Sequence, residues 1–179
     1  MSVCVPVRQC DSFSRPGPTT KGESTMDLQE LAKRIQRLED IEAIKQLKAT
    51  YCAICDDNHN PDRITTIFAE DGEWEGRGIG HAKGHVAIRE LFTGFQQAIS
   101  FSQHMVINPV VEVSGDRATA TWYFFGPFTM RDGNRALWQA ARYNDDYVKV
   151  NGVWKIQHLR VKGPRMSADY ATGWAAAKR

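Results

Sequence analysis

The chain has 179 residues, of which 42% are hydrophobic and 10% aromatic, so it can form one domain with a substantial core. Its 23 basic and 21 acidic residues leave a formal charge of +2 without a long basic run, which argues against nucleic acid as a partner. No stretch approaches the roughly 18 consecutive apolar residues of a membrane span, so we expect no membrane partner either.

The N-terminal segment has the composition of an unstructured arm. Residues 1–25 mix Pro, Gly, Ser and Thr with few large apolar side chains, and they lack the basic lead-in and apolar core of a secretory signal. We therefore expect a disordered arm on a cytoplasmic protein. Cys52 and Cys55 form C-x-x-C within a helical pattern but without a second pair of zinc ligands, so we interpret them as buried helix residues.

Residues 26–55 have the pattern of a long amphipathic helix, with Asp27 as a candidate cap. Apolar residues recur at spacings of three and four, and this stripe comprises Leu28, Leu31, Ile35, Leu38, Ile41, Ile44, Leu47 and Tyr51. We expect most of the stripe to be core. The helix should end before Pro61, because proline disfavours helical geometry in the residue that precedes it.

The elements between residues 61 and 99 are expected to be short. Pro61 suits the first turn of a second helix, which we expect to run to Ala69. A turn at 70–72 and a strand at 73–75 should follow, and then a flexible glycine-rich loop at 76–84 whose spacing lacks the dinucleotide-binding fingerprint. Apolar residues at helical spacing predict a third helix over 85–99.

From residue 101 the pattern changes to that of strands. Ranges rich in Val, Ile, Thr and aromatic residues predict strands at 101–113, 117–131, 136–150 and 153–161. Glycine-containing turns separate them, so we expect an antiparallel meander, bent at Pro109 and Pro127. With a tail or helix at 166–179, the domain spans 26–165. Helices first and sheet last predict an α+β fold, in which a strongly curved antiparallel sheet wraps around the long helix as an open cone.

Four motifs resemble the SnoaL-like branch of the nuclear transport factor 2-like superfamily. They are Tyr51-x-x-x-x-Asp56 at the helix end, the segment 67–74, His104 at the head of a strand, and Gly152-Val153-Trp154-Lys155-Ile156. The resemblance covers residues 27–163 and implies a cone-shaped α+β barrel. Within the branch the pattern is most similar to cofactorless lyases: scytalone dehydratase, bile-acid 7α-dehydratase and hexachlorocyclohexane dehydrochlorinase. Segment 73–84 is similar to the dehydrochlorinase in particular.

The resemblance implies that His104 and Asp56 form a catalytic dyad and that Tyr51 assists it. A neutral imidazole, with an ordinary pKa near ~6.5, can accept a proton from carbon, and a carboxylate on its other nitrogen fixes the tautomer and stabilises the imidazolium. From the residues alone, His104 could equally be a core histidine and Tyr51 a core residue. Asp56 could be a helix-end residue, with Asp57 as a competing candidate.

Further residues are predicted to bind substrate. Strand alternation groups His158 and Arg160 with Trp154, and the resemblance implies that this face points into the cone, although a subunit contact is an alternative. Arg160 could polarise a substrate oxygen and His158 could act as a second acid. Tyr143 and Trp74 complete the predicted substrate-binding set. The other histidines, namely His59, His81 and His85, are expected on the surface, and we predict no metal and no cofactor.

These features predict a cofactor-independent lyase that acts on a hydrophobic cyclic or aromatic small molecule, as in aromatic compound catabolism. The reaction would be elimination of water or a related leaving group, or retro-aldol loss of formaldehyde. An isomerase or cyclase of a polyketide- or steroid-like substrate is one alternative, and a non-catalytic small-molecule-binding module is another. The resemblance also implies a homodimer or homotrimer.

Overall fold

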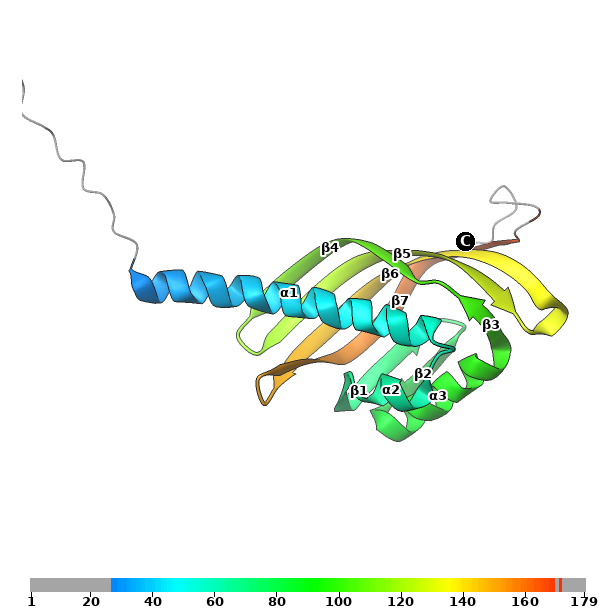
Figure 1. The fold of residues 1–179 in the computed structure, drawn as a ribbon, viewed down its shortest axis with the longest axis horizontal. Helices are drawn as coiled ribbons and strands as arrows, with labels where there is room; N and C mark the ends of the chain where they lie inside the picture. Colours follow the sequence, from blue (N-terminus) through cyan, green and yellow to red (C-terminus); the bar gives the residue numbers. More distant parts are fainter. Residues whose placement is uncertain (1–26, 170, 172–179) are drawn as a thin grey trace, which may run out of the picture.

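The structure, a computed structural model, describes residues 27–169 and residue 171 (Figure 1). Its helices are α1 (Leu28–Asp56), α2 (Pro61–Thr65) and α3 (Gly84–Ala98). Its strands are β1 (Phe68–Gly76), β2 (Gly80–Lys83), β3 (Ile99–Ser102), β4 (Met105–Ser114), β5 (Arg117–Met130), β6 (Arg135–Val150) and β7 (Val153–Asp169), with a short 3-10 turn, η1 (Asp132–Asn134). The predicted N-terminal arm and most of the predicted tail lie outside the described residues. Among those described, no helix is long and apolar enough to span a membrane.

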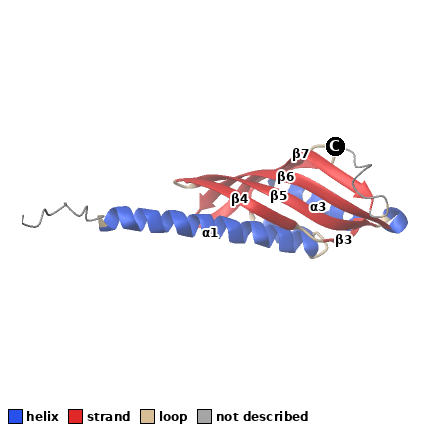
Figure 2. Ribbon diagram, turned by 90° about the horizontal axis from the view of Figure 1, so that it is seen from above, coloured by secondary structure: helices blue, strands red, loops and turns tan. Residues whose placement is uncertain are grey.

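The strands form one curved sheet in the order β2-β1-β7-β6-β5-β3, with β4 also paired to β5. The long helix α1 lies along one face of this sheet (Figures 1 and 2). The helices α2 and α3 lie near β1 and β2 (Figure 1). This is the predicted α+β architecture. One difference is that β1 runs parallel to its neighbour β7, so the sheet is mixed and not purely antiparallel.

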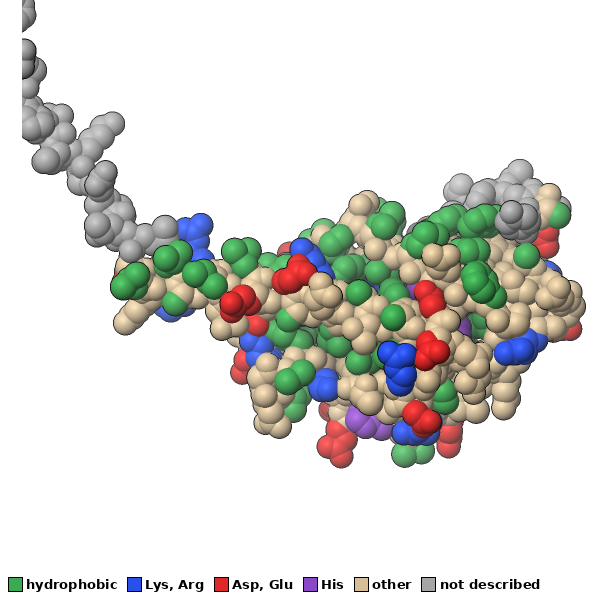
Figure 3. All heavy atoms as spheres, in the orientation of Figure 1, with side chains coloured by type: hydrophobic (Ala, Val, Ile, Leu, Met, Phe, Trp, Pro, Cys, Tyr) green, Lys and Arg blue, Asp and Glu red, His purple; other side chains and the backbone are tan. Residues whose placement is uncertain are grey.

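Only the second half of α1 packs into the core. Asp27 caps its start, accepting a hydrogen bond from the backbone N–H of Gln29 at 3.2 Å. From Asp40 onward the helix lies against the sheet, and its buried residues are Asp40, Ile44, Lys48, Tyr51, Cys52, Ile54 and Cys55. The first half projects beyond the sheet and leaves its apolar side chains exposed, namely Leu28, Leu31, Ile35 and Leu38 (Figure 3). Core packing therefore explains only the second half of the predicted stripe.

The region after α2 differs from the prediction. The second helix ends at Thr65, and β1 already begins at Phe68, which pairs with Ile156 of β7. The predicted turn at 70–72 is an irregularity inside β1, where the register with β7 shifts before Glu73. A Cβ on Gly72 would lie 2.9 Å from the Ala69 carbonyl oxygen, so the chain can bend this tightly only at glycine. The predicted loop at 76–84 contains the short strand β2.

The meander of β4 to β7 is confirmed, and its predicted glycine-containing turns contain residues in the left-handed region. Asn151 and Gly152 both have positive φ, +50° and +79°, as the tight turn between β6 and β7 requires. The bend at Pro109 is confirmed, because the β4–β5 register shifts between Ile107 and Val110. The bend at Pro127 is not: β5 pairs with β6 in unbroken register through that residue. The predicted strand 101–113 is interrupted at Gln103–His104, between β3 and β4.

The last strand is longer than predicted and contains a bulge. It runs to Asp169, so residues 166–169 are strand and not the start of a tail. Its pairing with β6 joins Tyr147 to Ile156 but Asp146 to His158, so Gln157 is an extra residue. An extra residue reverses which side chains face inward beyond it. Burial follows this reversal, because Ile156 is buried before the bulge and Leu159 after it.

Candidate active site

The end of α1 and the start of β4 bring Asp56 and His104 together, as predicted. The Asp56 carboxylate accepts the imidazole Nδ1–H of His104 at 2.7 Å, and the backbone N–H of His104 lies 3.0 and 3.1 Å from its two oxygens. The His104 side chain is 6% exposed and that of Asp56 is 31% exposed, so the imidazole is inside and the carboxylate at the rim. Three contacts on one carboxylate fix both the ring and its backbone.

The position of His104 depends on a close approach of two backbone segments. The backbone N–H of Gln103 donates to the Pro127 carbonyl at 3.1 Å. A Cβ on Gly126 would lie only 2.0 Å from the Gln103 carbonyl oxygen, so glycine is required there. At this point β5 changes its pairing partner. Phe125 of β5 pairs with Met105 of β4, whereas Phe128 pairs with Ser102 of β3, so Gln103 and His104 are left out of the ladder. The freed segment carries the His104 ring into the interior.

This geometry determines which nitrogen of His104 is available. A carboxylate can only accept, so Nδ1 carries the hydrogen and Nε2 keeps a free lone pair. The ring lies between aromatic neighbours, with centroids 5.1 Å from Phe124 and 5.2 Å from Phe128. An imidazole held by a carboxylate on one side and surrounded by apolar groups on the other is equipped to accept a proton from a bound molecule.

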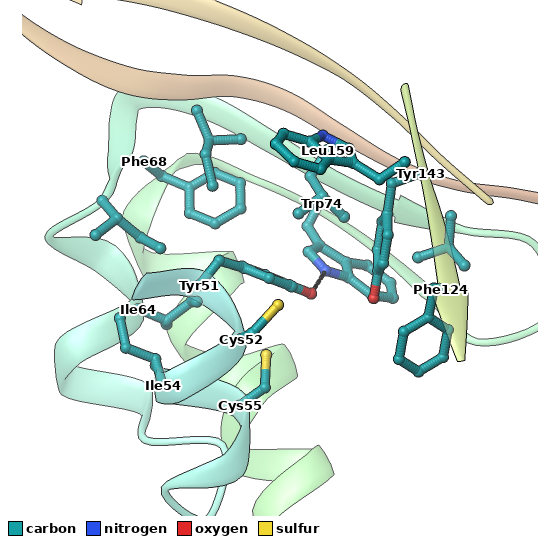
Figure 4. Close-up of a cluster of buried hydrophobic side chains, with 14 of the residues drawn as sticks. Tyr51, Cys52, Ile54, Cys55, Ile64, Phe68, Trp74, Phe124, Tyr143 and Leu159 are labelled. Carbon is teal, nitrogen blue, oxygen red and sulfur yellow. Dashed lines mark hydrogen bonds between the residues drawn. The ribbon is translucent and has the colours of Figure 1, made fainter. Parts of the chain in front are cut away.

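Tyr51 lies one turn before Asp56 on the same helix and faces the same space. Its hydroxyl accepts a hydrogen bond from Trp74 Nε1 at 3.0 Å, and its ring packs edge-on against Tyr143, with centroids 6.0 Å apart (Figure 4). Burial raises the pKa of Tyr51 and of Tyr143 well above their ordinary values. Both phenols therefore remain protonated at neutral pH and keep a hydrogen available for donation.

These residues line a cavity of about 580 Å³. Its wall is mostly apolar and aromatic, with contributions from α3, β5 and β6 such as Phe92, Phe95, Phe128 and Ala141. The polar groups on the wall include the predicted Tyr51, His104, Tyr143 and Trp74. A cavity of this size with few polar groups is typical of a site for a small hydrophobic molecule.

His59 is the residue that sequence reasoning missed. It was expected on the surface, but it is 4% exposed and lines the cavity, with its ring centroid 5.8 Å from that of His104. Asn58 and His59 both adopt positive φ after the end of α1, and this left-handed turn folds the ring back inward. The signal was present in the spacing, because His59 stands four residues beyond Cys55 and extends the buried stripe. Burial lowers the pKa of His59 to about 4, so it is neutral at pH 7.

The expectation that His158 and Arg160 face the cavity is wrong. Both follow the Gln157 bulge, which turns them to the opposite face, while Val161 lines the cavity in their place. Arg160 donates to Asp146 at 2.7 Å and to Nδ1 of His158 at 2.7 Å. Asp57 also lies outside, where it accepts from Arg63 at 2.8 Å.

Two groups of potential metal ligands occur among the described residues. One comprises Cys55, His59 and His104 at the cavity, and the other comprises Glu73, Glu75 and His158 on the opposite face. In the second group Arg160 donates to Nδ1 of His158, so Nε2 must carry the hydrogen and has no lone pair for an ion. His81 and His85 stand four residues apart but are not paired on one helix, because His81 lies in β2 and bonds Glu73 at 2.6 Å.

A family model described as the SnoaL-like domain matches residues 36–160, more than half of the chain. The chain belongs to the SnoaL-like domain family. The residues matched in this SnoaL-like protein include Tyr51, Asp56, His59 and His104, so the whole candidate site lies inside the family domain. The predicted family is therefore confirmed.

Comparison with known proteins finds sequence similarity to a dehydrochlorinase and structural similarity to two further proteins. Hexachlorocyclohexane dehydrochlorinase 1 of Sphingobium indicum is 26% identical over 108 residues, which cover 58% of this chain and 68% of that enzyme. A solved structure from Novosphingobium aromaticivorans, provisionally assigned as a scytalone dehydratase, has a TM-score of 0.68 at 24% identity, covering 75% of this chain and 89% of that one. A nuclear transport factor 2-like protein of Salmonella enterica has a TM-score of 0.62 at 18% identity, covering 75% and 94%. The two structural likenesses concern the fold alone.

Proposed function

We propose that this protein is a cofactor-independent lyase that uses His104 as a general base on a hydrophobic cyclic or aromatic small molecule. The observation that carries the proposal is the 2.7 Å contact between His104 Nδ1 and Asp56, which leaves Nε2 free inside an apolar cavity. The likeness to a dehydrochlorinase, a protein that carries out elimination, supports the same reaction class.

The proposed chemistry is proton abstraction coupled to departure of a leaving group. Nε2 of His104 takes a proton from a carbon next to the one that bears the leaving group, and the C–H electron pair forms the new double bond. Asp56 stabilises the imidazolium that results, since it already accepts the Nδ1–H. Tyr51 donates its hydroxyl hydrogen towards the leaving oxygen or halide, and its protonated state suits that role. In the retro-aldol variant the same base takes the proton of a hydroxymethyl group, and the O–H electron pair forms the C=O of formaldehyde. The electrons of the breaking C–C bond pass to a conjugated carbonyl of the substrate, and the carbon left behind then takes a proton from the His104 imidazolium.

The wall of the cavity defines the class of substrate. The aromatic side chains Phe92, Phe95, Phe124 and Phe128 favour a ring-containing molecule, which can be held by edge-to-face contacts. Gln139 and Glu90 add two further polar groups to the lining. A molecule with an apolar ring and a single polar substituent near Tyr51 fits this distribution.

The proposal is tested by turnover. A panel of cyclic alcohols, cyclic halides and aromatic alcohols with an acidified C–H is incubated with the protein, and the products are followed by mass for loss of water, hydrogen halide or formaldehyde. His104→Gln should lower turnover by roughly 10²–10⁴-fold, the usual contribution of a general base. His81→Gln is the matched control. His81 is exposed on β2, so this variant should turn over substrate as fast as the wild type. Unchanged turnover in His104→Gln would refute the lyase mechanism.

The same panel separates the alternatives. An isomerase or cyclase would give a product of unchanged mass while exchanging the substrate C–H with deuterium from D₂O. A binding module would bind panel members without either change. The direct Asp56–His104 contact favours an enzyme over a module, since a module has no use for a fixed imidazole tautomer.

We further propose that the protein is a homo-oligomer of the cytoplasm. The exposed stripe Leu28, Leu31, Ile35 and Leu38 follows the 3-4-3 spacing of a helix–helix seam, and a second copy of α1 would cover it. Cys52 and Cys55 are free thiols within the core, consistent with a reducing compartment. Sedimentation of the wild type and of Leu31→Gln/Leu38→Gln tests the assembly, which the double substitution should weaken.

A further inference from the structure

The cavity wall carries a second constellation that the proposed base chemistry does not use. Cys55, His59 and His104 each present one ligand atom, the thiol sulfur or a ring nitrogen, and these atoms all lie within 4.8 Å of one another. Cys55 and His59 come from the end of α1 and the turn that follows it, and His104 comes from the β3–β4 junction. We refer to these three residues as the Cys–His–His cluster.

Each member of the cluster has a free lone pair or an ionisable thiol. His104 donates Nδ1–H to Asp56, so its Nε2 is free, and a carboxylate behind a histidine is the usual support of a metal-bound imidazole. The Nδ1 of His59 is buried, and none of the residues that the structure describes forms a hydrogen bond with it, although His59 is only 4% exposed. Buried polar atoms in proteins are seldom left without a partner, so this nitrogen points to a ligand. Cys55 is a free, buried thiol.

We propose that the Cys–His–His cluster binds one transition-metal ion of the zinc class, with the cavity side left open for a fourth ligand. One thiolate and two imidazoles are a donor set that suits Zn²⁺ and Co²⁺. Ligand atoms around a tetrahedral zinc ion lie roughly 3.3–3.8 Å apart, so the cluster contracts slightly on binding. The Cys55 thiol gives up its proton to solvent as the sulfur–metal bond forms, and no electron is transferred.

Metal binding has a consequence for the proposed lyase, and this consequence rests on that proposed function. The ion occupies the Nε2 lone pair of His104, the same lone pair that would accept the substrate proton. One chain therefore cannot hold the ion and act as a base at the same time. The cluster acts as an inhibitory site: the metal-free protein is the active form, and stoichiometric Zn²⁺ switches it off.

The test of binding does not need a substrate. The 179-residue chain carrying Cys4→Ser and Cys10→Ser, which removes the thiols of the N-terminal segment, is freed of metal with a chelator and titrated with Co²⁺. We expect one equivalent to bind, with thiolate-to-cobalt charge-transfer absorption and the visible bands of a tetrahedral ion. Cys55→Ser should abolish the charge-transfer absorption. Cys52→Ser, which removes a buried thiol three residues earlier on the same helix, should retain it.

Two further variants keep the test decisive if Cys55→Ser does not fold. His59→Gln should weaken Co²⁺ binding by at least tenfold, and Asp56→Asn should weaken it by roughly 10–100-fold through the supporting hydrogen bond. Absence of cobalt absorption in the parent protein, or equal absorption in Cys55→Ser, overturns the proposed site. Loss of turnover on adding one equivalent of Zn²⁺ supports the inhibitory role. Full turnover in the Zn²⁺-loaded protein overturns that role, even where the spectra show binding.

Discussion

The helix α1 contributes to two contacts between a carboxylate and a basic side chain, and the two contacts have different roles. Asp145 of β6 accepts from Lys48 Nζ at 2.8 Å, and both side chains are 0% exposed. Asp56, at the end of α1, accepts from His104 at 2.7 Å and is 31% exposed. The two distances are nearly equal, so distance alone does not explain their different roles.

The difference lies in proton mobility and access. Lys48 is wrapped by aromatic rings, with Nζ 3.4 Å from the Tyr143 ring centroid and 4.7 Å from that of Tyr51, so the pair supports the cavity wall from behind. Burial raises the pKa of Asp145, and the Lys48 ammonium opposes that effect. The Asp56–His104 pair instead contains an imidazole that binds the carboxylate only through Nδ1, and this ring lines the cavity. One pair is structural and the other is suited to chemistry.

Of the substitutions considered, Asp56→Asn should have the largest effect, and this effect should be a loss of activity. The Asn amide no longer stabilises the imidazolium of His104, so we expect turnover to fall by roughly 10³–10⁴-fold, or ~4–5.5 kcal/mol. The melting temperature should change little, because Asp56 is partly exposed. Turnover within tenfold of the wild type, on a substrate identified by the panel, would show that the carboxylate is not part of the chemistry.

Removing one partner of the buried Lys48–Asp145 pair should have the second largest effect, and this effect should be a loss of stability. Lys48→Met leaves the Asp145 carboxylate buried without its partner, so the free energy of unfolding should fall by about 3–5 kcal/mol in a urea titration. The double variant Lys48→Met/Asp145→Leu should recover most of that loss, because no charge then remains buried. A single variant as stable as the wild type would contradict the structural role of this pair.

His59 should make stability depend on pH in a defined window. Its pKa is about 4 in the folded chain and near ~6.5 when unfolded, so the unfolded state takes up the proton first as pH falls. The stability from the buried neutral ring is complete above about pH 6.5 and is lost as pH falls to about 4, by about 3 kcal/mol. In the presence of chelator, His59→Gln should lack this part of the acid-induced loss in denaturant titrations. His81→Gln, altered at an exposed histidine, should retain the part of the loss that His59 causes.

The smallest effect is expected for the residues that the bulge turns outward. Arg160→Gln should leave turnover within about twofold, and the loss of its partly exposed ion pair with Asp146 should cost at most about 1 kcal/mol of unfolding free energy. His158→Gln should behave alike. A selective loss of turnover in either variant, at unchanged stability, would mean that this face of β7 contributes to the site after all.

Most of the element order was readable from the sequence because it depends on local patterns, but β2 and the break between β3 and β4 were not predicted. The apolar spacing of α1, the three glycine turns and the alternation of β5 and β6 each predict their own element without knowledge of its neighbours. Tyr51, Asp56 and His104 were recognised through the family resemblance. In the structure Tyr51 and His104 line one cavity, and Asp56 binds His104 from its rim. Trp74 and Tyr143 were predicted to bind substrate, and both line the cavity.

Other features depend on contacts between segments that are distant in the sequence, and only the tertiary structure decided these. The Gln157 bulge, which turns His158 and Arg160 outward, arises from pairing between β6 and β7 and leaves no local mark in the sequence. Because β1 pairs in parallel with β7, the turn predicted at 70–72 is an irregularity within a strand. His59 reaches the cavity only because two left-handed residues fold it back against His104. Sequence periodicity determines which side chains share a face of an element, whereas register and chain reversal determine what that face meets.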